Sequence, residues 1–444
     1  MSGPRLGAAF GQARRALGGR FLRDGVWIMG AYGVTIISGL VSVRLFTELA
    51  MPSVFGGANL LLGVLTLGTQ TLLAPITQTQ LRYHSAHRDE GNADAYTWRI
   101  AKYAGSAAVL MIIVLAIVLL AWPAARAGAH IWVIPDLAAW TIASTYRSVL
   151  INRIQADRRQ KYYSLWLGSE ALSTMACTAV VLYFSPTIEG YIGGQALGVT
   201  LTALAYGRIP KRPPAAARQD LSVAGVQAQI RAYGLPFAPF ALMGWLSNQS
   251  DRYVLAAYLS TAAVGQYAAA FGISSRLPQV AGGLLNDLFR PALFEAENRG
   301  DFARGKRLLM AWLVGLTATI TVLIFALFLF GDHLADLLLA KAYRPGAKEI
   351  MCWIATGYGF TVLAQVIENQ IFAMGSSRTL LWTKLSGGVA NVALAIAIVP
   401  AYGVLGAARA NVVGQLFQLL ATVWAARLLQ AKRTVAASAT TDAN

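Results

Sequence analysis

Apolar segments of about 20 residues recur along the whole chain, separated by short polar connections. A helix of this length crosses the ~30 Å hydrocarbon layer of a bilayer. Backbone groups inside lipid must find their hydrogen bonds within the segment, which favours helices. The composition agrees, because 56% of the 444 residues are hydrophobic and only 13% are charged. We therefore predict an all-α integral membrane protein.

Twelve membrane-spanning helices are predicted. Their ranges are 25–47, 53–79, 103–122, 131–152, 163–184, 187–206, 235–257, 262–289, 308–330, 349–374, 380–400 and 404–427. Three spans deviate most from a purely apolar segment, because they contain charged residues or many glycines. They are 131–152, 187–206 and 262–289. An even number of crossings places both termini on the same side of the membrane.

The net charge of +17 is a signal of topology. With the N-terminus placed in the cytoplasm, the inner segments hold 28 of the 37 Lys and Arg residues, and the outer loops hold four. This asymmetry follows the positive-inside rule. We therefore expect both termini in the cytoplasm and the lipid bilayer as the surroundings, and we expect no nucleic-acid partner.

The chain divides into two halves of six spans. A basic segment, 1–24, is predicted to lie on the inner membrane surface, and the longest mid-chain polar stretch, 207–234, is predicted to be a cytoplasmic linker. The linker separates a bundle at 25–206 from a bundle at 235–427, and a cytoplasmic tail follows at 428–444. Six spans in each half predict parallel, pseudo-symmetric repeats around a central cleft.

A shift of 209 residues supports the internal repeat. It places Phe55-Gly56 on Val264-Gly265. The same shift places Gly63 on Gly272 and Gln70 on Gln279. The identities are few, but both halves also share a short outer turn, a long span and a charged inner loop.

Polar residues interrupt the seventh span, in the segment Gly244–Leu259. Asn248, Asp251 and Arg252 lie at i, i+3 and i+4 and so share one helix face. A charge at the bilayer centre costs at least about 2.5–3.5 kcal/mol, so such residues need a partner or water. Two interpretations stay open: an Asp-Arg pair that anchors the helix at the outer interface, or the wall of a polar cavity.

The eighth predicted span carries a second polar stripe. Arg276, Gln279, Asn286 and Asp287 follow one face, and Arg276 lies near the middle of the span. An arginine reaches the interface only from near a helix end, so anchoring does not explain Arg276. A buried ion pair with Asp251 or Glu170 remains an alternative to a place in a cavity.

Further polar stripes occur in both halves. They comprise Asn59, Thr66, Gln70 and Thr77; Gln365, Glu368 and Asn369; and Asn411, Gln415 and Gln418. Each stripe alone is compatible with hydrogen bonds between helices. Together they favour a shared water-filled cleft. Arginine suits an anionic ligand such as phosphate, because its planar donors match the oxygens and its charge is permanent. These residues predict transport of an anionic, hydrophilic cargo whose apolar tail stays in lipid.

The sequence gives little indication of a metal site, a disulfide bond or a reactive cysteine. Cys177 and Cys352 both lie inside predicted spans, and their spacing matches no disulfide framework or metal site. His84 and His87 are three residues apart in a charged inner segment, where we expect a solvated loop.

Several segments resemble a known family. The stretch "SNQSDRYVLAAYL", then "AVGQYAAAFGIS", then a Phe-Arg-Pro exit into a charged loop resembles the seventh and eighth spans of bacterial polysaccharide-biosynthesis membrane proteins. These are the O-antigen and exopolysaccharide flippases of the multidrug/oligosaccharidyl-lipid/polysaccharide (MOP) exporter superfamily. The segments "PAYGVLGAARANVVGQL" and "MPSVFGGANLLLGVLTLGTQTLLAP" are similar to the last and second spans of that family.

The resemblance implies a flippase working by alternating access in the bacterial inner membrane. Its cargo would be a polyprenyl-pyrophosphate-linked oligosaccharide, moved to the outer leaflet for exopolysaccharide, capsule or O-antigen synthesis. Polysaccharide polymerase and export machinery are candidate partners, and no cofactor is implied. The residues expected to bind substrate are Arg276, Arg252, Asn248, Gln279, Gln70 and Arg147, and those expected to couple transport or form ion pairs are Asp251, Glu368, Asp287 and Glu170.

Two alternatives remain. A cation-coupled multidrug antiporter of the same superfamily would want acidic groups facing its cavity, and acids and arginines inside the spans are near balance. A membrane polysaccharide polymerase or glycosyltransferase would need a sizeable outer loop or a carboxylate cluster. The longest outer loop, 331–348, offers only Asp332 and Asp336, with His333 beside them. We therefore expect no enzyme, and the absence of a GxxxxGK[ST] pattern argues against direct ATP hydrolysis.

Overall fold

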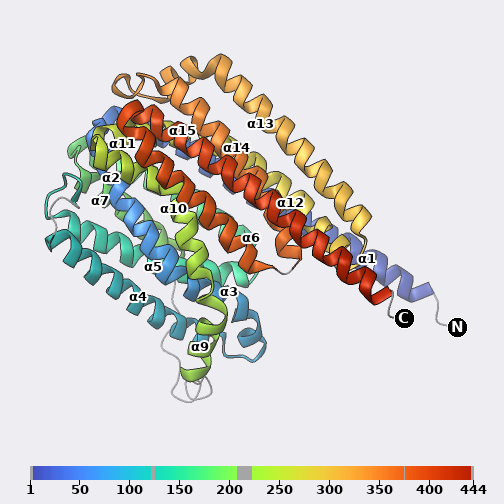
Figure 1. Ribbon diagram of the computed structural model, residues 1–444. Coiled ribbons are helices and arrows are strands. Elements are labelled where there is room, and N and C mark those ends of the chain that lie inside the picture. The colour runs from blue at the N-terminus through green and yellow to red at the C-terminus, as the bar shows by residue number, and fades with distance from the viewer. Residues whose placement is uncertain (1–3, 122–125, 208–222, 375, 442–444) are drawn as a thin grey trace.

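The computed structural model describes residues 4–121, 126–207, 223–374 and 376–441, and these residues are almost entirely helical (Figure 1). In chain order the helices are α1 (Pro4–Leu49), α2 (Pro52–Gly68), α3 (Ala74–Asp89), α4 (Ala93–Ala121), α5 (Val133–Ala156), α6 (Gln160–Phe184), α7 (Ile188–Tyr206), α9 (Val223–Gln229), α10 (Phe237–Tyr258), α11 (Thr261–Ser274), α12 (Arg276–Asn298), α13 (Phe302–Leu338), α14 (Ala347–Ala373) and α15 (Ser377–Thr441). The predicted linker at 207–234 falls largely on residues 208–222, which lie outside the described residues.

The predicted all-α membrane fold is confirmed, and the described helices run back and forth between two ends of the molecule (Figure 1). Their order gives twelve crossings within the described residues. Helices α2 and α3 form one crossing, joined by a π-helical turn at Thr69–Leu73. Helix α15 supplies two crossings, because the chain reverses at Gly403, which has φ 59° and ψ −140°. Only glycine adopts this conformation without strain. Among the described residues, seven helices meet the length and hydropathy expected of a membrane span.

The predicted span at 262–289 forms one crossing, but it is divided into two helices at Ser275. Helix α11 ends at Ser274 and α12 begins at Arg276. Pro278 explains the break, because it has no N–H to donate to the Ser274 carbonyl, and its ring opposes a continuous helix. The break places Arg276 at the first position of a new helix, in the middle of the molecule.

The two halves, α1–α7 and α10–α15, meet most extensively through α2 and α11. A Cβ atom added at Gly56 would lie 1.8 Å from the Thr261 carbonyl oxygen, and one added at Gly265 would lie 1.9 Å from the Pro52 oxygen. The shift of 209 residues takes Gly56 to Gly265 and Pro52 to Thr261, so the two contacts are equivalent. Equivalent contacts in both directions are expected where two like surfaces meet across a two-fold axis. The two halves are therefore pseudo-symmetric, and these glycines let the backbones touch.

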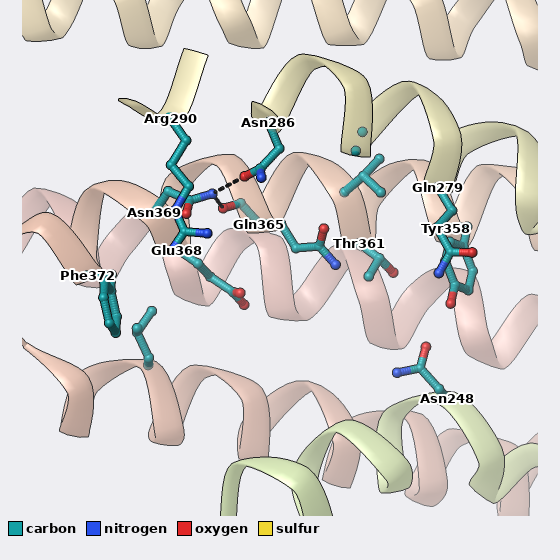
Figure 2. A pocket seen from close by; sticks show the side chains of 14 residues that line it. Asn248, Gln279, Asn286, Arg290, Tyr358, Thr361, Gln365, Glu368, Asn369 and Phe372 are labelled. Atoms are coloured by element: carbon teal, nitrogen blue, oxygen red, sulfur yellow. Dashed lines mark hydrogen bonds between the residues drawn. The ribbon is translucent and has the colours of Figure 1, made fainter. Parts of the chain in front are cut away.

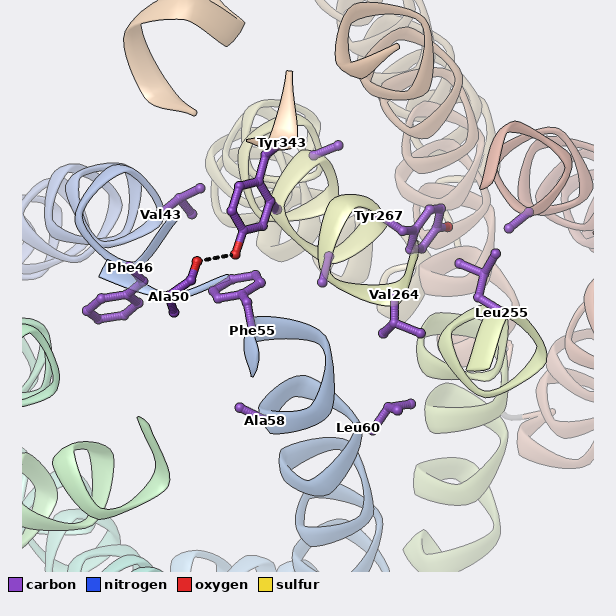
Figure 3. Close-up of a cluster of buried hydrophobic side chains, with 14 of the residues drawn as sticks. Val43, Phe46, Ala50, Phe55, Ala58, Leu60, Leu255, Val264, Tyr267 and Tyr343 are labelled. Carbon is purple, nitrogen blue, oxygen red and sulfur yellow. Dashed lines mark hydrogen bonds between the residues drawn. The ribbon is translucent and has the colours of Figure 1, made fainter. Parts of the chain in front are cut away.

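Aromatic side chains close one end of the interface between the halves (Figure 3). Tyr191 packs edge-on against Phe46 and Phe55, with ring centroids 5.3 and 5.7 Å apart. The Tyr343 hydroxyl donates to the Ala50 carbonyl oxygen at 2.7 Å, which ties the second half to the end of α1. We call this region, defined by these five residues, the closed end.

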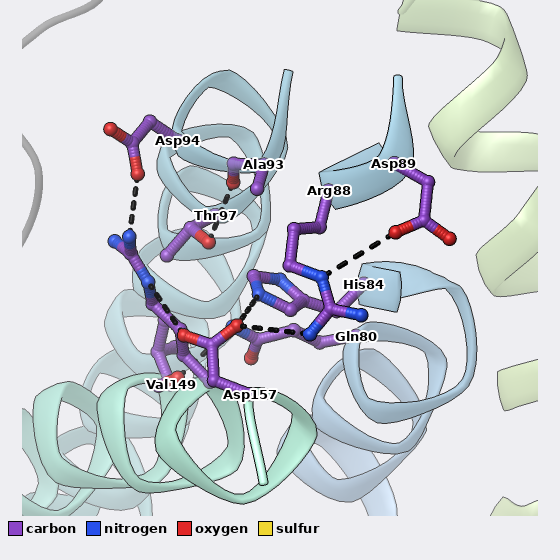
Figure 4. Close-up of polar contacts among 10 residues, drawn as sticks. Gln80, His84, Arg88, Asp89, Ala93, Asp94, Thr97, Val149 and Asp157 are labelled. Atoms are coloured by element: carbon purple, nitrogen blue, oxygen red, sulfur yellow. Dashed lines mark hydrogen bonds and ion pairs between the residues drawn. The ribbon is translucent and has the colours of Figure 1, made fainter. Parts of the chain in front are cut away.

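The opposite end carries the basic connections α3–α4, α5–α6 and α12–α13, and we call it the basic end. An ionic cluster there joins α3, α4 and α5 (Figure 4). His84 Nε2 lies 3.1 Å from Asp157 Oδ1, and Arg153 lies 2.6 Å from Asp94. The expectation of a solvated His84 was wrong, because its side chain is fully buried. Burial follows from α3 continuing to Asp89 and packing against α4 and α5.

Candidate functional site

A cavity of about 380 Å³ lies between the two halves, next to the closed end. Its walls come from α1, α2, α6, α7, α10, α11 and the first residue of α12. Phe46, Phe55 and Tyr191 form its wall on the side of the closed end, where their rings pack edge to face. Polar side chains line the rest: Thr35, Ser38, Ser42, Asn59, Glu170, Thr174, Gln195, Arg252 and Arg276. We call this space the central cavity.

Arg276 reaches across the central cavity from the second half to the first. Its Nη1 atom donates to the Ile36 carbonyl oxygen of α1 at 3.3 Å. A Cβ atom added at Gly39 would lie 1.4 Å from the same Nη1 atom, so the guanidinium occupies the space that a side chain on α1 would fill. Within the described part of the chain, Arg276 forms no ion pair. The suggested buried pair with Asp251 or Glu170 is therefore absent from this structure.

Arg252 is the second cation of the cavity. Its side chain is only 7% exposed, and its guanidinium lies over the ring of Phe271, 4.7 Å from the centroid. The Nε atom is buried and has no hydrogen-bond partner among the described residues. A buried donor left without a partner is costly, so an incoming acceptor is favoured there. Arg252 thus offers an unsatisfied positive group to the cavity.

Asp251 does not neutralise its neighbour Arg252. Its carboxylate is 1% exposed and accepts hydrogen bonds from the Tyr267 hydroxyl and, at 3.4 Å each, from the side-chain amides of Asn391 and Asn411. All three donors are neutral. The idea of an Asp-Arg anchor at the outer interface is contradicted, since the structure buries both side chains between helices.

Glu170 is the carboxylate that lines the central cavity, and it is already paired. Arg147 on α5 donates to it through Nε at 2.8 Å. Arg147 itself does not line the cavity. Because this pair is neutral overall, Arg252 and Arg276 leave the cavity with a net positive charge. A guanidinium in a cavity of low dielectric attracts anions more strongly than it would in water.

A second cavity of about 520 Å³ runs toward the basic end within the second half (Figure 2). Helices α10, α12 and α14 supply its amide side chains, which are Asn248, Gln279, Asn286, Gln365 and Asn369. The Asn369 amide donates to Asn286 Oδ1 at 3.1 Å, which ties α14 to α12. Glu368 also lines the cavity, but Lys384 lies 2.8 Å from its carboxylate and Gln418 donates to it at 3.2 Å. We call this space the amide groove.

The structure thus brings together most residues that the sequence marked. Arg252 and Arg276 share the central cavity, and Asn248, Gln279 and Glu368 share the amide groove. Gln70 lines neither cavity. Asp287 is exposed on α12 and accepts a hydrogen bond from Asn286 at 3.4 Å, outside the groove.

Sequence reasoning missed Gly39, Phe271 and Asn391. Gly39 had a recognisable signal, because it belongs to a run of small residues on one face of α1 with Thr35 and Ser42. Phe271 and Asn391 had none, since each gains its role only from helices that pack beside it.

The fold, the closed end and the charged cavity between the halves define a multi-pass membrane transporter. The chain belongs to the polysaccharide biosynthesis protein family, whose model matches residues 21–297. Among curated protein sequences, none matches the chain significantly.

Solved structures of the MOP superfamily share this fold. The lipid II flippase MurJ, in an inward closed conformation, has a TM-score of 0.69 at 13% identity over 90% of this chain and 87% of its own. An inward-facing multidrug resistance transporter of the MATE family has a TM-score of 0.62 at 16% identity over 93% and 94%. A MOP transporter from Pyrococcus furiosus, with a reversed polarity of its binding pocket, has a TM-score of 0.57 at 11% identity over 92% and 95%.

Proposed function

We propose that this protein is a flippase that moves a polyprenyl-pyrophosphate-linked oligosaccharide from the inner to the outer leaflet of the bacterial cytoplasmic membrane. The observation that carries the proposal is the pair of arginines, Arg252 and Arg276, which face one cavity without a carboxylate partner. Guanidinium groups bind phosphate oxygens with two parallel hydrogen bonds. A pyrophosphate in the central cavity would satisfy both cations.

The charge distribution argues against a drug antiporter as the alternative. A cationic drug needs a free carboxylate in the cavity, and both cavity carboxylates, Glu170 and Glu368, are paired with cations. Asp251 is buried behind the cavity wall and bound to neutral donors. The net positive charge of the central cavity therefore favours an anionic substrate over a cationic drug.

Alternating access follows from the position of Arg276. Aromatic rings pack together at the closed end, and the Arg-rich connections at the basic end are expected to face the cytoplasm. The hydrogen bond from Arg276 to the Ile36 carbonyl is weak, because it is long and its acceptor is neutral. A phosphate oxygen is the stronger acceptor. We propose that an arriving pyrophosphate replaces the Ile36 carbonyl as the hydrogen-bond acceptor of Arg276. This exchange would break one contact between the halves.

Complementation tests the proposal. A strain that lacks its own oligosaccharide flippase should regain surface polysaccharide when it expresses this protein together with the matching glycan-synthesis genes. Restored polysaccharide would support the flippase. Resistance to cationic drugs without any polysaccharide would instead support the antiporter.

Gly39→Leu should reproduce the loss of Arg276. The new side chain would occupy the space of the guanidinium, since a Cβ atom alone would lie 1.4 Å from Nη1. The displaced guanidinium can no longer hold a phosphate at this position, so we expect polysaccharide export to fall about tenfold or more. Export of labelled polysaccharide per amount of membrane-inserted protein measures the effect. Gly30→Leu is the matched control, because a Cβ atom on that glycine of the same helix meets nothing within 4 Å. Equal export by the two variants would contradict the assigned position of Arg276.

A further inference from the structure

The amide groove has the chemistry of a site for uncharged polyols. Side-chain amides carry two donors and an acceptor oxygen each, which suits the hydroxyl groups of sugars. Asn248, Gln279 and Gln365 line the groove from three different helices, so donors and acceptors face the space from several directions (Figure 2). The carboxylate of Glu368 is paired with Lys384, and Arg290 adds a positive charge at one end of the groove, so the lining offers a cation no unpaired carboxylate.

The amide groove begins on the same two helices, α10 and α12, that carry the two arginines. Asn248 precedes Arg252 by four residues on α10, and Gln279 follows Arg276 by three on α12. Residues at these spacings are neighbours on one helix face, with Cβ atoms about 5–6 Å apart. The residues that line the groove therefore begin one helical turn from the two arginines, within reach of a molecule whose pyrophosphate lies in the central cavity.

The length of the groove suits an oligosaccharide. Along α12 its lining extends from Gln279 to Arg290, which is about 16 Å of helix at 1.5 Å per residue. Arg290 and Phe372 lie at the far end of the groove from Asn248 (Figure 2). Phe372 is 51% exposed and offers a flat apolar face for a sugar ring.

We propose that the amide groove binds the glycan of the lipid-linked substrate, and that the central cavity between the two halves binds the pyrophosphate. The inference rests on the proposed flippase function and divides the substrate between two sites. It assigns the selection of the glycan to α10, α12 and α14 of the second half.

Gly283 allows the groove to be filled without disturbing the protein. It lines the groove, and a Cβ atom added there meets nothing within 4 Å. Gly283→Phe would therefore project a ring into the groove, whereas Gly283→Ala would leave most of it open. Gly315→Phe is the matched control, because Gly315 is exposed on α13, has equal room for a side chain and lines neither cavity.

The test measures binding by native mass spectrometry of the purified full chain in detergent. The probes are undecaprenyl pyrophosphate and undecaprenyl pyrophosphate that carries a neutral tetrasaccharide. We expect the unaltered protein to bind the glycosylated probe more tightly than the bare probe. Gly283→Phe should lower the affinity for the glycosylated probe about tenfold and change the affinity for the bare probe less than about twofold. Gly283→Ala and Gly315→Phe should bind both probes as the unaltered protein does.

Two results would overturn the inference. The first is equal binding of both probes by the unaltered protein, and the second is an equal loss of both in Gly283→Phe. Either result leaves the flippase proposal standing, provided that the bare probe binds and Arg276→Gln weakens it. Failure of the unaltered protein to bind either probe would overturn the flippase proposal and this inference together.

Discussion

Arg276→Ala should abolish export of surface polysaccharide while the protein remains folded in the membrane. Its guanidinium extends into the central cavity and, among the described residues, donates only to the Ile36 carbonyl oxygen. Two hydrogen bonds from a charged donor to phosphate contribute about 3 kcal/mol or more, a factor of about a hundred in affinity. Removal of one long hydrogen bond to a carbonyl costs far less stability. Complementation of a flippase-deficient strain, with membrane abundance and melting temperature measured in parallel, checks both parts.

Two further variants sharpen the Arg276 experiment. Arg276→Lys keeps the charge but not the planar pair of donors, so we expect intermediate export. Arg307→Ala removes an exposed cation of α13 at the basic end and should leave export unchanged. Normal polysaccharide with Arg276→Ala would refute the role in binding. Loss of the protein from the membrane, together with loss of export, would assign Arg276 a structural role instead.

Asp251→Asn should stop gradient-driven transport with little loss of stability. The carboxylate is buried and accepts hydrogen bonds only from neutral donors among the described residues, namely Tyr267, Asn391 and Asn411, and we expect it to be the group that couples transport to an ion gradient. An amide of the same shape loses the charge and keeps only one acceptor oxygen, so its NH2 group faces a donor unless the Asn391 or Asn411 amide turns over. We expect this to cost about 1–3 kcal/mol in stability. Transport by reconstituted protein, measured with and without an imposed proton or sodium gradient, reveals the change.

The matched control for Asp251 is Asp287→Asn, which removes an exposed carboxylate of α12. This variant should respond to the gradient as the unaltered protein does. An Asp251→Asn protein that still responds fully to the gradient would show that coupling lies elsewhere. One that disappears from the membrane would show that the carboxylate serves the packing of α10 against α11 and α15.

The number and kind of crossings could be predicted from sequence because lipid leaves the backbone few choices. Each apolar segment had to satisfy its own hydrogen bonds, and only helices of the observed length do so in a bundle. The reversal at Gly403 was also visible, as a gap between two apolar runs. The break at Ser275 was missed, although Pro278 stood in the sequence, because the apolar pattern continues across it.

The polar stripes were predictable only within one helix. Helical periodicity placed Arg276 and Gln279 on one face, and the structure places both beside cavities. The stripe from Asn59 to Gln70 fails for a physical reason. Gln70 lies about 16 Å farther along the helix than Asn59, and Thr66, which precedes the π-helical turn at Thr69–Leu73, does not line the central cavity either, so the cavity ends before both residues. Contacts between helices, such as that of Asn391 with Asp251, leave no local signal.

Transbilayer movement of a lipid-linked oligosaccharide is the most direct measure of the central claim. Liposomes would contain the purified protein and undecaprenyl pyrophosphate bearing an oligosaccharide, and an added glycosidase would report the glycan that reaches the outer leaflet. We predict rapid, complete cleavage with the unaltered protein and a rate at least about a hundredfold lower with Arg276→Ala. Equal rates for the two proteins, or no movement above protein-free liposomes, would contradict the account.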